Sequence, residues 1–310
     1  MSDNAGINGM LRGFTVEGLA RYKELRKINY PNMYNSLNNR LTDSDFTKPD
    51  FDETTRDLFF FTSFCCISYA VLWFMVPRHY AEKSCHMQRI DLLFSAVYYP
   101  ILTFLAIDAT LVLGTGTVEQ RWQTVTRSSY SFEILFIGGN LAHIPVTFLK
   151  KQTLTYKLQL LAHHLLAIGC FVRTCYTGVG HFYVALDGCC EISTIFLNNV
   201  FLFKNLGVAE SKFSKVLNAV LLWVSYFLSR IVLFPAWLAM YFWDVSRHPQ
   251  ASLVFLTPVE QVVFPLTNVI LFLLSSIWMV SITKGALKAL RGEEDDLGPY
   301  QSNDEVHHKD

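Results

Sequence analysis

Seven long apolar stretches, separated by short polar connectors, dominate the pattern of this chain. They cover residues 58–76, 92–113, 132–149, 158–176, 182–203, 216–243 and 262–282. A helix needs roughly 20 apolar residues to cross about 30 Å of hydrocarbon, and only helices or closed barrels satisfy their backbone there. Barrel strands would alternate apolar and polar residues, which these stretches do not. The pattern therefore predicts an all-α, multi-pass transmembrane helical bundle with six or seven spans.

The composition agrees with a membrane protein. Hydrophobic residues make up 51% of the 310 residues and charged residues only 17%, whereas a soluble domain carries about 25% charged residues. The formal net charge is zero, so we expect no nucleic-acid partner. The cysteines lack metal-ligand spacing, and we expect no metal and no cofactor. The distribution of charge divides the chain into a polar N-terminal appendage (1–57), a transmembrane domain (58–290) and a disordered acidic tail (291–310).

Lys and Arg residues alternate between rich and poor connectors. The connectors 77–91, 150–157 and 204–215 and the segment 283–291 carry three each, whereas the intervening connectors carry two, none and one. The positive-inside rule places the richer set in the cytosol. With seven spans, the C-terminus would lie in the cytosol and the N-terminus on the other side of the membrane. If the N-terminus were also cytosolic, the chain would have six spans.

Several ionisable side chains lie inside the apolar stretches, where each costs at least about 2.5–3.5 kcal/mol and usually faces the protein interior. The 158–176 stretch contains the adjacent pair His163 and His164, followed by Arg173. Along the next stretch, the spacing of four polar residues predicts that they share one helix face; they are Asp187, Glu191, Thr194 and Asn198.

Depth in the membrane predicts which of these groups meet. The two stretches are joined by a tight turn at residues 177–180, so they run antiparallel. At 1.5 Å per residue, Arg173 is level with Asp187, and His164 reaches a depth close to that of Glu191. We therefore predict two cross-helix pairs, one between Arg173 and Asp187 and one between Glu191 and His164 or His163.

The histidine pair has three interpretations. Neutral imidazoles can simply hydrogen-bond neighbouring helices. They can also perform acid–base or nucleophilic chemistry, since imidazole titrates near neutrality and Glu191 could fix its tautomer. Ligation of a metal together with Glu191 is the weakest of the three, because no further ligand set accompanies them.

The other polar groups in the apolar stretches have plainer interpretations. Arg230 lies midway along the 216–243 stretch, and either a buried carboxylate partner or a lipid headgroup would account for it. Asn140 and His143 follow two adjacent glycines that allow close packing, so a role in helix packing is favoured over a functional one. Asp108 and Glu260 lie near the ends of apolar stretches and are expected to be ordinary boundary residues.

Four segments in order resemble the TLC-domain membrane family, which includes the ceramide synthases and non-synthase branches with roles in lipid homeostasis. They are HHLLAI (163–168), EISTIFLN (191–198), SRIVLFP (229–235) and TKGALKAL (283–290). The resemblance covers roughly residues 58–290 and implies a bundle around an internal, lipid-accessible cavity. It also implies catalytic candidates at His163, His164 and Asp187. The second aspartate of the synthases is missing, because Cys190 stands at that spacing and Glu191 follows it.

The favoured function is therefore that of a non-synthase TLC protein that binds or regulates lipids in the endoplasmic reticulum. An alternative is an acyltransferase resembling ceramide synthase, in which His163 or His164 acts as base or acyl carrier and Asp187 and Glu191 orient it. Its partners would be fatty acyl-CoA and a sphingolipid precursor. A transporter or purely structural bundle is a third alternative, although no inverted repeat is evident.

Overall fold

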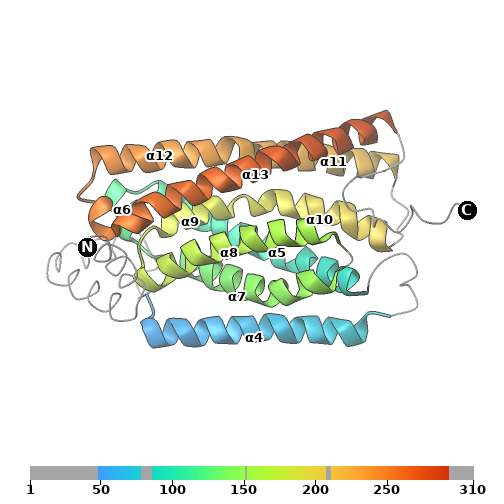
Figure 1. The fold of residues 1–310 in the computed structure, drawn as a ribbon, viewed down its shortest axis with the longest axis horizontal. Coiled ribbons are helices and arrows are strands. Elements are labelled where there is room, and N and C mark those ends of the chain that lie inside the picture. The colour runs from blue at the N-terminus through green and yellow to red at the C-terminus, as the bar shows by residue number, and fades with distance from the viewer. Residues whose placement is uncertain (1–47, 78–85, 151, 207–210, 293–310) are drawn as a thin grey trace, which may run out of the picture.

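A computed structural model describes residues 48–77, 86–150, 152–206 and 211–292, and this part of the chain is helical without strands. Figure 1 shows most helices side by side with their long axes roughly parallel. In chain order they are α4 (Phe51–Met75), α5 (His86–Gly114), α6 (Val118–Gln123), α7 (Arg127–Leu149), α8 (Leu154–Thr177), α9 (His181–Gly188), α10 (Glu191–Leu206), α11 (Lys212–Tyr226), the π-helix η2 (Phe227–Val232), α12 (Leu233–Arg247), the 3-10 turn η3 (Leu253–Phe255) and α13 (Pro258–Arg291).

Six helical runs are long and apolar enough to cross a membrane. They are α4, α5, α6–α7, α8, α11–α12 with η2 between them, and α13. The seventh apolar stretch forms α9 and α10, which follow one another through the bundle but are separated by a turn at Cys189–Cys190. The prediction of an all-α, multi-pass bundle is confirmed. Among the described helices, the apolar stretch 182–203 forms two helices instead of one continuous span.

Helix α4 begins earlier than the apolar pattern predicts. Its first turns carry charged residues, and Asp50 caps it by accepting a hydrogen bond from the Glu53 amide at 2.9 Å. The predicted boundary at residue 57 therefore falls inside this helix. Lys48 donates to the Tyr176 carbonyl oxygen at 3.0 Å, which connects the start of α4 to the end of α8. The rest of the predicted appendage and the acidic tail lie outside the described residues.

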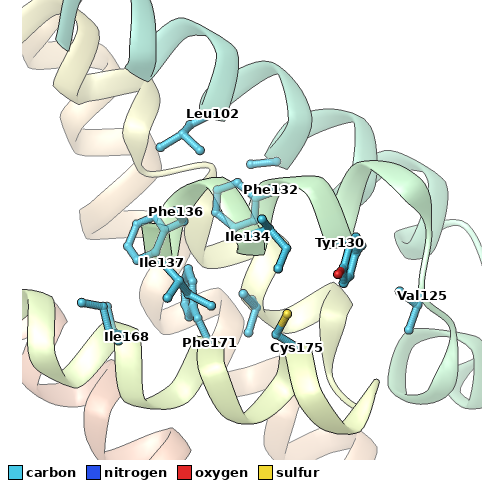
Figure 2. Packing of buried hydrophobic residues seen from close by; sticks show 13 residues of the cluster. Leu102, Val125, Tyr130, Phe132, Ile134, Phe136, Ile137, Ile168, Phe171 and Cys175 are labelled. Carbon is cyan, nitrogen blue, oxygen red and sulfur yellow. The ribbon is translucent and has the colours of Figure 1, made fainter. Parts of the chain in front are cut away.

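The core lies around α7, which is the most enclosed of the six runs, whereas α4 is the least enclosed. Figure 2 shows Phe132, Phe136 and Ile137 of α7 between Leu102 of α5 and Phe171 of α8. This central position follows from the sequence of α7, which lacks charged residues after its second turn and therefore offers apolar groups on all sides.

Two glycines allow close helix contacts at α7. An added Cβ on Gly139 would lie 2.1 Å from the hydroxyl oxygen of Tyr98 on α5, and one on Gly188 of α9 would lie 2.1 Å from the Phe132 ring. A side chain at either position would therefore force a neighbouring ring to move, in agreement with the close packing expected at residues 138–139. Large apolar side chains instead cover the outside of the bundle, for example Phe59, Phe74 and Ile277, as expected of a surface in contact with lipid.

Candidate functional site

The break between α9 and α10 lies in the middle of the predicted polar site. At the turn, the amides of Cys190, Ile192 and Ser193 bond to carbonyls three residues back, at 3.1–3.3 Å. Bonds to the fourth residue back would continue an α-helix. Asp187 therefore ends one helix and Glu191 begins the next, so the prediction that both share one face of a single helix is wrong. The turn directs the two carboxylates toward different neighbours.

Asp187 lines a small cavity of about 30 Å³ between α6, α8, α9, α12 and α13. Its walls are mostly apolar and include Phe171, Val184, Trp237 and Leu271. Asn268 Nδ2 donates to Asp187 Oδ1 at 3.1 Å, and no described residue donates to the other carboxylate oxygen. Asp187 is the one acidic side chain among the residues that line this cavity. The cavity thus offers a single strong acceptor on an apolar background.

A buried carboxylate that the sequence analysis missed organises the aromatic end of this cavity. Asp244 of α12 is fully buried and accepts hydrogen bonds from Arg121 Nη2 at 2.7 Å, Trp122 Nε1 at 3.1 Å and the Tyr183 hydroxyl at 2.7 Å. Trp122 and Tyr183 both line the cavity, so Asp244 fixes two of its walls. The sequence did hold a signal for this pair. Asp244 directly follows the long apolar stretch 216–243, and Arg121 lies in a connector that the positive-inside rule places on the same side of the membrane.

Arg173 does not pair with Asp187. Its guanidinium instead forms an ion pair with Glu260 in the first turn of α13, and Nη2 donates to Glu260 Oε2 at 3.2 Å. Depth along the helix axis does not say which neighbouring helix a side chain faces. Glu260, expected to be an ordinary boundary residue, is the partner, and it also accepts from the Thr257 amide at the start of α13.

The two histidines do not pair with Glu191. His164 is buried at 7% exposure, and neither of its ring nitrogens has a hydrogen-bond partner among the described residues. Its ring lies 5.4 Å from the rings of both His143 and His163, measured between centroids. His163 is less enclosed, and its ring lies 6.1 Å from that of Trp278 on α13. Neither histidine lines the Asp187 cavity, so the sequence-predicted site is divided among several positions.

A second network connects His164 to the Lys-rich end of the bundle. Asp91 of α5 accepts from Lys150 Nζ at 2.8 Å and from the Tyr69 hydroxyl at 2.8 Å, and His143 Nε2 lies 3.2 Å from Asp91 Oδ1. These groups join α4, α5 and α7, which supports the packing interpretation of His143. Asp91 could not be recognised from the sequence as a buried partner, because it falls in a connector just before an apolar stretch.

The predicted asparagines have local structural roles. Asn140 Nδ2 donates to the Phe136 carbonyl one turn earlier in α7, at 2.8 Å. Asn198 Nδ2 donates to the Leu92 carbonyl of α5 at 3.1 Å, which ties α10 to that helix.

No group of three His, Cys, Asp or Glu side chains in the described ranges is placed to hold a metal ion.

Arg230 lies on the π-helix η2, opposite the first turn of α10. Its Nε donates to Ser193 Oγ at 3.0 Å and its Nη2 to Thr194 Oγ1 at 3.2 Å, while its guanidinium carbon lies 5.3 Å from the centre of the Tyr226 ring. It forms no ion pair with an Asp or Glu of the described segments. Glu191 is within electrostatic range and interacts with the Thr194 hydroxyl. Two helix irregularities thus meet at these side chains.

Fold and site together define a multi-pass membrane protein with polar groups buried inside an apolar bundle. The TLC domain model matches residues 88–284, which include most of α5 to α13. The chain therefore belongs to the TLC domain family, as its motifs predicted.

One curated relative has a similar sequence. The TLC domain-containing protein 4-B of Xenopus laevis is 28% identical over 145 residues, which cover 46% of this chain and 53% of the relative. The match thus spans about half the length of that relative. No solved structure matches the chain.

Proposed function

We propose that this protein binds a membrane lipid in the Asp187 cavity and acts in lipid homeostasis. The observation that carries the proposal is the combination of one carboxylate with aromatic and aliphatic walls in the interior of the bundle. Apolar walls suit a hydrocarbon chain, and a small number of polar groups fix its orientation. A soluble ligand would have little reason to occupy such a site.

The carboxylate indicates the chemistry of the lipid head. Asn268 satisfies one oxygen of Asp187, and a buried carboxylate is stabilised when donors satisfy its remaining lone pairs. A lipid that carries a hydroxyl, amide or amine can supply such a donor. We therefore favour a sphingolipid or a related amino alcohol over a ligand whose head only accepts hydrogen bonds.

A simple experiment tests this proposal. The protein would be purified in mild detergent, and native mass spectrometry would identify the lipid that stays bound. Asp187→Asn keeps the size of the side chain but removes its charge, and a charge-assisted hydrogen bond is worth about 1.5–3 kcal/mol. Occupancy should therefore fall about tenfold or more.

The matched control is Asp108→Asn, which changes a carboxylate on α5 that does not line the cavity and accepts a hydrogen bond from Ser128. The control should retain the lipid. Equal occupancy in the Asp187 variant and the control, or a wild-type protein without any lipid, would exclude the cavity as the binding site.

A second candidate is acyl transfer from a fatty acyl-CoA thioester to an amine, which forms an amide and releases the thiol. The buried His164, with unpartnered ring nitrogens, favours it. The absence of both histidines from the cavity lining and the replacement of the second aspartate by Cys190 favour binding instead. Incubation with palmitoyl-CoA and sphinganine separates the two. Amide formation that His164→Ala abolishes would establish the transferase, and no amide from the wild-type protein would exclude it.

We place the protein in the membrane of the endoplasmic reticulum with a cytosolic C-terminus. The Lys- and Arg-rich connectors support this orientation. Fusing a glycosylation or protease reporter to each end would test it, and a modified reporter at the C-terminus would reverse the orientation.

A further inference from the structure

We propose that Arg230 forms a second lipid site, separate from the Asp187 cavity, which binds the carboxylate of a long-chain fatty acid. The inference goes beyond the proposed function, because it assigns an anionic ligand to a part of the bundle that the cavity does not include. It is argued from the position of Arg230, its hydrogen bonds and its charge balance.

Arg230 lies where a cation is least easily accommodated. It occupies the middle of the helical run Lys212–Arg247 and is 6% exposed, so its guanidinium is far from both ends of that run. A charge at such depth needs a partner or a water-filled cavity. Long basic side chains near the ends of a span can reach the headgroups instead, but this position does not allow it.

The hydrogen bonds of Arg230 satisfy the guanidinium only in part. Ser193 and Thr194 accept from two of its nitrogens, and both acceptors are neutral hydroxyls. A guanidinium has five N–H donors, so three have no hydrogen-bond acceptor among the described residues, including both on Nη1. Two parallel N–H groups match the two oxygens of a carboxylate. The free edge therefore has the geometry that a carboxylate ligand requires.

Glu191 is the obvious competitor for this edge. It is buried near Arg230 at 7% exposure and interacts with Thr194, to which Arg230 also donates. It balances the charge of Arg230 at a distance without forming an ion pair with it. Because an anionic ligand would be repelled by Glu191, a singly charged carboxylate fits better than a phosphate monoester, which carries up to two charges.

The surroundings indicate that the ligand is a lipid. Phe227, Leu228 and Val232 of the same π-helix are 38%, 56% and 46% exposed on the outside of the bundle. Arg230 and these outward-facing apolar side chains thus lie on the same π-helix, so an alkyl tail could remain in the hydrocarbon while its head enters. Single-turn π-helices occur frequently at functional sites, and this one places Arg230 against the first turn of α10.

Palmitic acid, with 1-hexadecanol as a neutral probe of the same length, tests this site on the full-length protein in detergent. Arg230→Gln should weaken palmitate binding at least about tenfold, with hexadecanol binding unchanged. Arg230→Lys keeps the charge but loses the two-pronged edge, so its palmitate affinity should be intermediate. Glu191→Gln removes the competing anion and should strengthen palmitate binding. Hexadecyl phosphate should bind more weakly than palmitate to the wild-type protein.

The Glu191 variant keeps the test decisive if Arg230→Gln does not fold. If Glu191→Gln weakens palmitate binding or leaves it unchanged, Glu191 is only the counter-ion of a structural arginine and the site does not exist. Equal affinity of the wild-type protein for palmitate and hexadecanol would overturn the inference in the same way. Failure of the proposed function is a separate result, since it is measured by the effect of Asp187→Asn on the co-purified lipid.

Discussion

Replacing Asp244 by alanine should destabilise this protein more than any change at its surface. Asp244 is fully buried and is the common acceptor for three side chains from different elements, namely Arg121 and Trp122 of α6 and Tyr183 of α9. Alanine would leave a cation and two further donors without their acceptor. The effect therefore goes well beyond the loss of one hydrogen bond.

The magnitude follows from the burial of the partners. Removing one member of a buried ion pair costs about 3–5 kcal/mol. The Arg121 side chain is 17% exposed, so part of its charge can be rehydrated, and we expect the lower end, about 3 kcal/mol. Trp122 and Tyr183 would lose their fixed positions in the cavity wall, so bound lipid should decrease together with stability.

Thermal unfolding in detergent, followed by intrinsic tryptophan fluorescence, measures this effect. For a protein of 310 residues, about 3 kcal/mol corresponds to a decrease in Tm of about 5 °C. The matched control is Asp52→Ala in the exposed first turn of α4, where loss of the favourable helix-dipole interaction costs about 0.3–1 kcal/mol. A Tm for Asp244→Ala no lower than that of the control would refute the reasoning.

Two further predictions concern helix contacts. Gly139→Ala should lower the free energy of unfolding by about 1–3 kcal/mol, because its Cβ would overlap the Tyr98 hydroxyl. Gly169→Ala is the control, since no atom lies within 4 Å of an added Cβ there, and it should be neutral or slightly stabilising. Equal Tm values for the two variants would contradict this packing. A double-mutant cycle on denaturant unfolding should give a coupling free energy above about 1 kcal/mol for Arg173 with Glu260 and close to zero for Arg173 with Asp187. The reverse order would restore the pairing predicted from depth.

The sequence predicted the architecture well because each span must satisfy its own backbone in hydrocarbon. That requirement makes length and hydropathy sufficient to locate α4, α5, α7, α8 and α13. The turn at residues 177–180 was also predictable, and Gly178 and Gly180 adopt the positive φ values of 71° and 84° that glycine allows. The resemblance to the TLC family was also confirmed, because the TLC domain model matches residues 88–284.

The candidate site was predicted only in part. The burial of His164 and Arg230 and the position of Asp187 at an internal cavity were foreseeable from the cost of exposing ionisable groups to lipid. Their partners were not, because residues at equal depth can face any of several neighbouring helices. Arg173 therefore pairs with Glu260 of α13, which is 87 residues away along the chain.

What the sequence determined by itself is the set of helices and the list of polar side chains that must be buried inside the membrane. Both follow from local quantities, the hydropathy of a segment and the cost of burying a charge. The tertiary structure alone decided the turn between α9 and α10, the π-helix under Arg230 and the assembly of the cavity around Asp187. These depend on the rotation of each helix about its axis and on contacts between distant residues, which no local property of the chain encodes.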